Sequence, residues 1–512
     1  MKKIVPILCA LCLMLGLIMA TGYTAEAQKK KTFVFGDTTF NPENNEPDIN
    51  PHNDNSGWAA IRYGVGETLF RYSAAMGLEP WLAKSYELID EHTWKITLQD
   101  NVHFTSGRHM DGQAVKECLE ALIKNHTRAR GDLHIASITA EDQTLTIVTS
   151  TPVPALPNYL ADPYGCIFDI KAGITPEGIV SATGPYKAKT LASGERLNLV
   201  KNDNYWNGTP KIDEITVLTI SDGDTLTMAL QSGEIDAAYG MPYASYPLFQ
   251  NDKYIFSSVA TSRAFFLWMN FKSEIAKEPA VRKAVAMGID KENFVKVLLG
   301  GNGYPAKGVF PSSFSYGNEA VTTATYDPQG AKKVLEEAGW IVGRDGIREK
   351  DGRKLVIRWL TYPSRQELPV LAESAQATLK DIGIAVEINS TADHNRIKID
   401  PDAWDIYVSA MITAPTGDPQ YFFTYCTLDS SPTNNGHYHS DKLEELAKKM
   451  SQTFDVKERE RLAVEMQQTI LDDNAYVFAS HLRMSMISKA NVVGLVAHPS
   501  DFYEITVDLD VK

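Results

Sequence analysis

Residues 355–388, LVIRWLTYPSRQELPVLAESAQATLKDIGIAVEI, contain a complete strand–helix–strand unit and decide the fold class. Residues 355–360, which are apolar except for Arg358, have the length of a strand, and residues 385–388 predict the next strand. A helix is expected over about residues 369–382, because proline is tolerated in a first turn and Gly383 suits the end of a helix. Strands that alternate with helices are typical of an α/β protein.

The N-terminal half repeats this organisation. Residues 94–98 and 145–148 alternate between apolar and polar side chains, as half-buried strands do. Apolar residues between them recur at helical spacing over residues 114–123. Strand–helix–strand units thus lie on both sides of about residue 270, which predicts two α/β lobes. Further helices are expected over residues 443–450 and 456–471.

Composition limits the class of protein. The chain has 512 residues, of which 44% are hydrophobic and 22% charged, as in globular proteins of several domains. The formal net charge of -14 argues against a nucleic-acid partner, because nucleic-acid binding needs clustered Lys and Arg. The only long apolar run is at the N-terminus, so we do not expect the protein itself to form a membrane pore.

The N-terminus has the features of an export signal. Lys2 and Lys3 precede an uncharged apolar run over residues 4–20, and Ala25-Glu26-Ala27 is typical of a cleavage site. The alternative is a membrane anchor, but the run is only as long as the shortest spanning helix. We therefore predict a signal peptide over residues 1–27, cleaved after Ala27, and a periplasmic location.

Cysteine usage agrees with a free exported protein. No cysteine stands at the cleavage site, so a lipid anchor is not expected. Three of the 5 cysteines, Cys118, Cys166 and Cys426, lie beyond the apolar run, and an odd number allows at most one disulfide. Cys118 falls on the apolar face of a predicted helix, where a buried free thiol is expected.

Motifs of common enzymes are missing from the sequence. It has no G-x-S-x-G, no H-E-x-x-H, no P-loop and no dinucleotide-binding fingerprint. We therefore expect a protein that is not an enzyme, with no catalytic residue and no cofactor. A hidden acid–base pair among its many carboxylates stays an open alternative.

Five short segments occur along the chain in a fixed order. They are Glu79-Pro80-Trp81-Leu82-Ala83, Thr183-Gly184-Pro185-Tyr186 with Asn204-Tyr205-Trp206, Ser232-Gly233-Glu234-Ile235-Asp236, Val281-Arg282-Lys283-Ala284 with Ile289-Asp290, and Asp381-Ile382-Gly383-Ile384. From about Phe33 to the C-terminus, the chain resembles the family-5 extracellular solute-binding proteins, which serve peptide and nickel ABC importers.

The resemblance implies an α/β periplasmic binding protein fold of the type II-like, two-lobe kind, with a hinge and an interlobe cleft. Lobe I would comprise residues 28–267, lobe II residues 268–485, and residues 486–512 would return to lobe I. A small peptide or metal-chelate ligand would be captured between the lobes and delivered by a monomer to the ABC permease in the membrane. The alternative is a receptor for signalling, or a chaperone-like protein, on the same fold.

The resemblance also suggests where cargo would bind. Peptide-binding members hold the peptide amine with an Asp three residues before an Asp-Pro pair, which here is Asp418-Pro419. The corresponding residue is Pro415, which has no charge to offer. The Ala414-Pro415 pair is instead similar to the nickel-binding branch.

Members of the nickel branch hold the carboxylates of a metal chelate with two arginines. One of them corresponds to Arg128, whereas the other falls near Tyr164, and Arg130 could substitute for it. His52 falls on a family Asn-Pro-His segment, where it either lines the mouth of the lobe I pocket or packs internally. Trp58 and Tyr421 are the aromatic residues that we expect in the cleft, because polar loops surround them.

His437 and His439 are candidate metal ligands. In a strand, residues two apart point to the same face, so both imidazoles could bind one cation of the nickel, copper or zinc type. Nickel or a metal chelate would then be bound as cargo. The alternative is a solvent-exposed loop after the polar run over residues 430–436.

Overall fold

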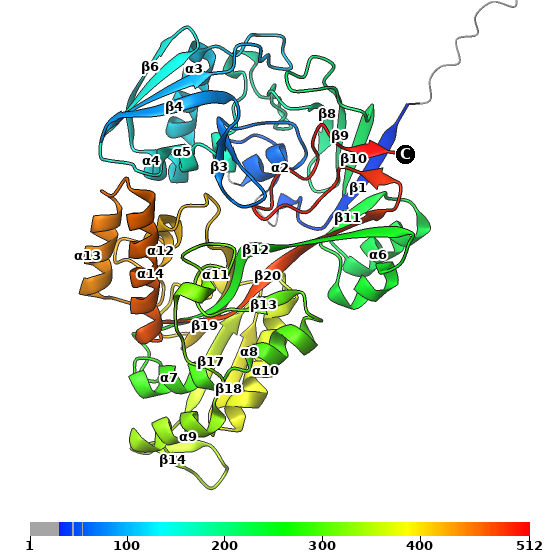
Figure 1. Ribbon diagram of the computed structural model, residues 1–512. Coiled ribbons are helices and arrows are strands. Elements are labelled where there is room, and N and C mark those ends of the chain that lie inside the picture. Colours follow the sequence, from blue (N-terminus) through cyan, green and yellow to red (C-terminus); the bar gives the residue numbers. More distant parts are fainter. Residues whose placement is uncertain (1–29, 43–45, 54) are drawn as a thin grey trace, which may run out of the picture.

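The computed structural model describes residues 30–42, 46–53 and 55–512, so the predicted signal peptide lies outside the described residues. Two α/β lobes are joined by long strands that run through both of them (Figure 1). The fold class predicted from the sequence is confirmed. In the described part of the chain, no helix has both the length and the apolar character needed to cross a bilayer.

One sheet of eleven strands runs through the whole molecule. Its lobe I part contains β8 (Tyr186–Ala192), β9 (Arg196–Lys201), β10 (Glu214–Thr219), β1 (Thr32–Asp37) and β11 (Ala237–Tyr239). Its lobe II part contains β19 (Ile406–Ile412), β17 (Val356–Thr361), β18 (Ala385–Ser390) and the short β13 (Gly303–Pro305). β12 (Tyr254–Met269) and β20 (Tyr476–Lys489) belong to both parts.

The two shared strands connect the lobes. β12 and β20 pair in antiparallel fashion along most of their length, with a register irregularity between Ala260 and Ala264. β20 continues into pairing with β11 in lobe I, and β12 pairs with β19 in lobe II from Arg263 onward. The lobe boundaries predicted from the sequence, at 267/268 and 485/486, lie within these two strands.

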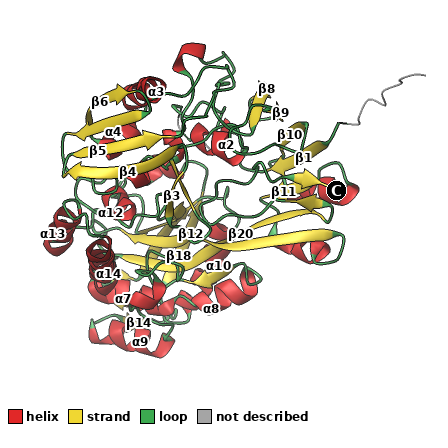
Figure 2. Ribbon diagram, turned by 45° about the horizontal axis from the view of Figure 1, so that its top comes forward, coloured by secondary structure: helices red, strands yellow, loops and turns green. Residues whose placement is uncertain are grey.

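A second sheet of four antiparallel strands belongs to lobe I (Figure 2). Its order is β4 (Ala83–Asp90), β5 (Thr93–Leu98), β7 (Thr144–Thr149) and β6 (Ile135–Glu141). Three smaller sheets lie outside these two among the described residues. They are the pair of β2 (Phe70–Tyr72) and β3 (Leu78–Pro80), the pair of β21 (Val492–Val493) and β22 (Asp510–Val511), and the three strands β14 (Ile341–Val342), β15 (Arg348–Lys350) and β16 (Arg353–Lys354). The helices of lobe I are α2 (Ser56–Arg62), α3 (Gly112–Asn125), α4 (Thr127–Leu133), α5 (Leu156–Tyr159) and α6 (Gly223–Ser232).

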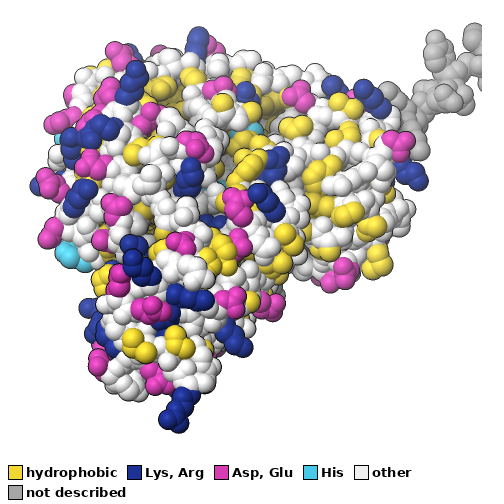
Figure 3. Space-filling view, turned by 60° about the horizontal axis from the view of Figure 1, so that its bottom comes forward, with side chains coloured by type: hydrophobic (Ala, Val, Ile, Leu, Met, Phe, Trp, Pro, Cys, Tyr) yellow, Lys and Arg dark blue, Asp and Glu magenta, His cyan; other side chains and the backbone are white. Residues whose placement is uncertain are grey.

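Helices cover both faces of the sheet in lobe II, so β17 and β19 are buried on both sides. One face carries α7 (Pro279–Gly288), α8 (Lys291–Asn293), α9 (Pro328–Glu337) and α10 (Glu367–Lys380). The other carries α12 (Gln420–Cys426), α13 (Asp441–Met450) and α14 (Val456–Asp472), and the short α11 (His394–Ile397) lies beside them. On the face in Figure 3, basic and acidic side chains are interspersed.

Two of the five sequence segments converge on one buried carboxylate, that of Glu67. It accepts hydrogen bonds from Trp81 Nε1 at 2.8 Å, Thr183 Oγ1 at 2.8 Å, Tyr205 OH at 2.7 Å and Trp206 Nε1 at 2.9 Å. Burial raises the pKa of Glu67, whereas the four donors lower it. These segments therefore form a structural unit of lobe I, held together by a side chain that none of them contains.

We expect Glu67→Gln to lower the free energy of unfolding by about 2–5 kcal/mol, because an amide cannot accept all four hydrogen bonds and leaves buried donors unpaired. Chemical denaturation measures the loss. Glu79→Gln is the matched control, since the Glu79 side chain is 46% exposed and its change should stay within about 0.5 kcal/mol. Equal stability of Glu67→Gln and wild type would show that this carboxylate does not organise the segments.

Candidate ligand-binding site

The sheet directs strand ends from both lobes toward one another. β1 and β11 are parallel in lobe I, and β17 and β19 are parallel in lobe II. Since β11, β20, β12 and β19 pair antiparallel in turn, the lobe I and lobe II pairs run in opposite directions. Their carboxyl ends therefore face each other across the hinge, which is where α/β sheets bind ligands.

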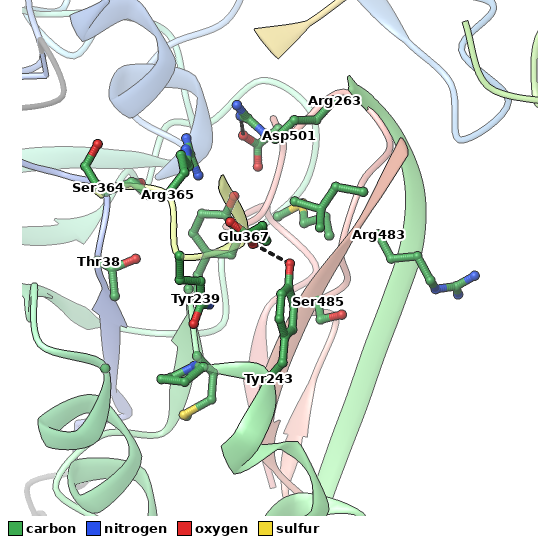
Figure 4. A pocket seen from close by; sticks show the side chains of 18 of the residues that line it. Thr38, Tyr239, Tyr243, Arg263, Ser364, Arg365, Glu367, Arg483, Ser485 and Asp501 are labelled. Carbon is green, nitrogen blue, oxygen red and sulfur yellow. Dashed lines mark hydrogen bonds and ion pairs between the residues drawn. The ribbon is translucent and has the colours of Figure 1, made fainter. Parts of the chain in front are cut away.

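A pocket of about 270 Å³ lies at this junction (Figure 4). Thr38 follows β1, Gly240 follows β11, residues 363–367 follow β17, and Ile412 ends β19; all line the pocket. Gly240 has a φ of +84°, and a Cβ there would lie 1.8 Å from Thr38 Oγ1. Only glycine therefore allows the two lobe I strand ends to approach this closely.

Two arginines place positive charge at one end of the pocket. Arg263 Nη2 lies 3.3 Å from Asp501 Oδ2. Arg365, in the loop after β17, makes no hydrogen bond or ion pair through its side chain to any residue in the described ranges, and it lines the same pocket. Burial, followed by the positive charge of Arg365, lowers the pKa of Arg263. This end of the pocket is therefore suited to an anion.

A hydrogen bond joins the lobes at the other end of the pocket. Tyr243 OH, from the segment after β11, donates to Glu367 Oε1 at the start of α10, at 2.5 Å. Burial and the charge of Glu367 raise the pKa of Tyr243, so its phenol stays a donor. Arg483 is turned away from the pocket and donates to Ser258 Oγ at 2.9 Å.

A buried charge cluster lies behind the pocket. Arg62 is surrounded by the carboxylates of Asp37, Glu46, Asp501 and Glu504, at 3.2 to 3.9 Å. Burial raises the pKa of Glu46 to about 7 and that of Glu504 well above its usual range. Asp501 is shared, because its Oδ2 is 3.6 Å from Arg62 Nη2 and 3.3 Å from Arg263 Nη2. The negative charge of Asp501 is therefore shared between Arg263 and Arg62.

Three residues predicted from the sequence do come together, at a second contact between the lobes. The Arg128 guanidinium of α4 lies 4.7 Å from the Tyr164 ring centroid and 5.7 Å from that of Tyr421 on α12. It also pairs with Asp162 and, at 3.5 Å, with Asp132. Arg128 is therefore already bound by protein groups, which the sequence did not reveal.

The other candidates of lobe I lie apart from the pocket. Arg130 donates to two backbone carbonyls at the end of α3. His52 is buried with its ring centroid 4.7 Å from that of Phe168, and burial lowers its pKa to about 4. Trp58 is half-buried and packs edge-on against Phe502. Neither Arg130 nor His52 lines the pocket between the lobes, and in this structure the His52 ring packs against Phe168.

Pro415 lies in the buried loop between β19 and α12, at the contact between the lobes. The carbonyl of the next residue, Thr416, accepts a hydrogen bond from Asn158 Nδ2 of lobe I at 2.8 Å. Gly417 approaches lobe I as well, with its ideal Cβ position 3.1 Å from the Met76 carbonyl oxygen. The loop that includes Pro415 therefore contacts the opposite lobe through its backbone.

The strand needed for the proposed His437–His439 pair does not form. His437 has a left-handed φ of 53°, and the segment has no strand pairing. His439 is exposed, with Nδ1 3.0 Å from Asp429 and Nε2 3.3 Å from Asp441, and these carboxylates raise its pKa. Among the residues described, no group of three or more His, Cys, Asp and Glu side chains could hold a metal ion.

Sequence reasoning missed the charged residues of the pocket. Arg365 had a detectable signal, since it belongs to the polar loop directly after the strand predicted over residues 355–360. No sequence signal pointed to Arg263 and Asp501 as partners, because 238 positions separate them in the chain. The three cysteines beyond the apolar run are buried free thiols, as expected for Cys118.

Comparison with known proteins agrees with this architecture. The nickel-binding protein NikA of Staphylococcus aureus is 29% identical over 403 residues, 79% of this chain and 80% of that protein. The oligopeptide-binding protein AppA of Bacillus subtilis is 28% identical over 63% of this chain and 61% of its own length. The crystal structure of S. aureus NikA with Ni(L-His)2 superposes with a TM-score of 0.80 at 25% identity, covering 94% of this chain and 100% of that one.

A family model agrees with these relatives and confirms the resemblance predicted from the sequence. Residues 77–434 match the model described as bacterial extracellular solute-binding proteins, family 5 Middle. The match spans more than half of the chain, including the loop after β17 and the segment after β11 that line the pocket. This chain belongs to the family-5 bacterial extracellular solute-binding proteins.

Proposed function

We propose that this protein captures a small anionic ligand in the pocket between its lobes and delivers it to the membrane permease of an ABC importer. The chain is a substrate-binding protein of the peptide and nickel type. The main evidence for an anionic ligand is Arg365, whose guanidinium lines the interlobe pocket and forms no ion pair with any of the described residues. Export as a periplasmic monomer, with residues 1–27 removed, belongs to the same proposal.

The ligand that fits best carries a carboxylate. An arginine binds a carboxylate through two parallel hydrogen bonds, and both a short peptide and a metal–amino acid chelate present such a group. The volume of about 270 Å³ favours a small ligand of either kind. Arg263, in the hinge part of β12, and Arg365, in the loop after β17, would both hold its carboxylate, which relieves the repulsion between the two guanidinium groups.

Capture works by closure of the lobes. We place the hinge at the irregular register of β12 between Ala260 and Ala264 and at the neighbouring part of β20. A ligand that contacts both lobes only in the closed state shifts the population toward that state. The hydrogen bond from Tyr243 to Glu367 stabilises the same closed state from inside the pocket.

Arg365→Ala should weaken binding by about 10- to 150-fold, which corresponds to the loss of about 1.5–3 kcal/mol from a charged hydrogen-bonded pair. Calorimetry with Ni(L-His)2 and with a dipeptide panel measures this loss. Arg483→Ala is the control, because Arg483 lines the pocket but points away from it. Unchanged affinity of Arg365→Ala for a ligand that wild type binds would refute the anionic site.

Arg128→Ala should instead lower the stability of the ligand-free protein by about 3–5 kcal/mol, because it leaves a buried carboxylate uncompensated. That carboxylate, of Asp162, is only 1% exposed. Denaturation curves measure the change, and Arg130→Ala serves as a control on the same helix. If Arg128→Ala keeps the stability of wild type but loses affinity for the ligand, Arg128 is a ligand-binding arginine.

Tyr243→Phe should open the ligand-free protein, since it removes the hydrogen bond that joins the lobes at the pocket. Small-angle scattering is expected to show a larger radius of gyration than wild type without ligand, and equal values with saturating ligand. Tyr246→Phe is the control, because that ring packs within lobe I against Phe256. If Tyr243→Phe and wild type scatter identically without ligand, the Tyr243–Glu367 contact does not govern closure.

A further inference from the structure

We propose that His103 and His109 form a two-histidine site for a divalent transition-metal cation on the surface of lobe I, separate from the interlobe pocket. Backbone register and ring geometry define this site, whatever ligand the protein transports.

The backbone places the two histidines opposite each other. His103 and His109 form an antiparallel bridge that closes the turn over residues 104–108. The flanking backbone hydrogen bonds run from Phe104 N to Arg108 O and from Met110 N to Val102 O, each at 2.9 Å. The pair between them is therefore a non-hydrogen-bonded pair, whose side chains lie on one face with Cβ atoms about 4.5–5.5 Å apart.

The rings already have the separation that chelation requires. Their centroids are 5.1 Å apart, with an interplanar angle of 62°. A metal–nitrogen bond of about 2.0–2.1 Å places each coordinated ring centroid about 3.2 Å from the metal, so two rings at angles between 90° and tetrahedral have centroids about 4.5–5.2 Å apart. A small rotation of the side chains would therefore bring both nitrogens to one cation without moving the backbone.

The hydrogen bonds leave the required nitrogens available. His109 Nε2 lies 2.9 Å from the carbonyl oxygen of Asp100. A carbonyl only accepts, so Nε2 carries the proton and Nδ1 keeps its lone pair, as in metal-binding histidines oriented by a backbone carbonyl. His103 is exposed and makes no hydrogen bond or ion pair within the part of the chain that the structure describes. Each ring thus offers one free nitrogen.

The turn that carries the pair is anchored to lobe I. Arg108 donates to Asp169 at 2.9 Å and to Glu117 at 2.9 Å, and Ser106 Oγ donates to Asp169 at 2.8 Å. Gly107 takes the left-handed φ of +91° that the turn needs. Because these contacts hold the turn before metal arrives, little ordering entropy is lost on binding.

The donor set selects the class of cation. Two neutral imidazoles suit Ni²⁺, Cu²⁺ and Zn²⁺, with water completing the coordination. The formal net charge of -14 draws cations toward the chain in general. His437 and His439, which are exposed and two residues apart, lack this geometry.

Titration of untagged protein with NiCl2 alone, followed by calorimetry, tests the proposal. We expect one Ni²⁺ to bind, with affinity weakened at least about tenfold by His103→Asn or by His109→Asn. The double substitution should weaken binding little further, because either single change already breaks the chelate. A matched control replaces both His437 and His439 by Asn and should keep the site.

Thermal unfolding gives a second measurement. NiCl2 should raise the melting temperature of wild type but not that of the His103 and His109 variants, whose metal-free melting temperatures should equal that of wild type. Arg365→Ala should retain the nickel site, which separates this inference from the proposed transport ligand. The proposal is overturned if wild type binds no Ni²⁺ at millimolar NiCl2, or if only the His437 and His439 substitutions abolish binding.

Discussion

The pairing of β12 with β20 is the constraint on which the molecule depends. These two strands belong to the sheets of both lobes, so the lobes cannot separate completely and can only rotate about the connection. The antiparallel pairing also fixes the direction of every strand added on either side. As a result, the carboxyl ends of β1 and β11 face those of β17 and β19, and the pocket forms between them.

Two buried carboxylates, those of Glu67 and Asp501, differ in how completely their charges are matched by their partners. Glu67 accepts four hydrogen bonds and is fully satisfied, which makes it suitable for holding segments of lobe I in one arrangement. Asp501 is divided between Arg62 and Arg263, so it leaves the positive charge of the pocket only partly balanced. The first arrangement holds segments of lobe I in place, and the second would leave electrostatic attraction for the anionic ligand that we propose.

Contacts between the lobes occur on two sides of the hinge. Tyr243 reaches Glu367 within the pocket, and Arg128 lies against Tyr421 on the other side. Both contacts involve polar groups that could exchange protein partners for water when the lobes open. Closure can therefore be reversible, which a transport protein needs because it must release what it captures.

The sequence alone determined the elements and the family. Apolar periodicity over residues 114–123 predicted the helix now seen as α3 at Gly112–Asn125. A first-turn proline and Gly383 predicted α10, which is shifted by two residues to Glu367–Lys380, and α13 and α14 agree with the prediction within two residues at either end. Periodicity succeeds because a helix or strand buries one face through local spacing. The five segments identified the family through their residues and their order along the chain, which need no knowledge of the contacts between them.

Only the tertiary structure decided which side chains meet. Local spacing made His437 and His439 a pair, but a left-handed turn at His437 prevents the strand on which that pairing depended. His103 and His109 became the facing pair because a closed turn places them opposite each other. Arg263 meets Asp501 across 238 positions of sequence because both lie at the junction of the shared sheet. Such contacts depend on strand register and lobe closure, which arise from long-range packing that no local pattern encodes.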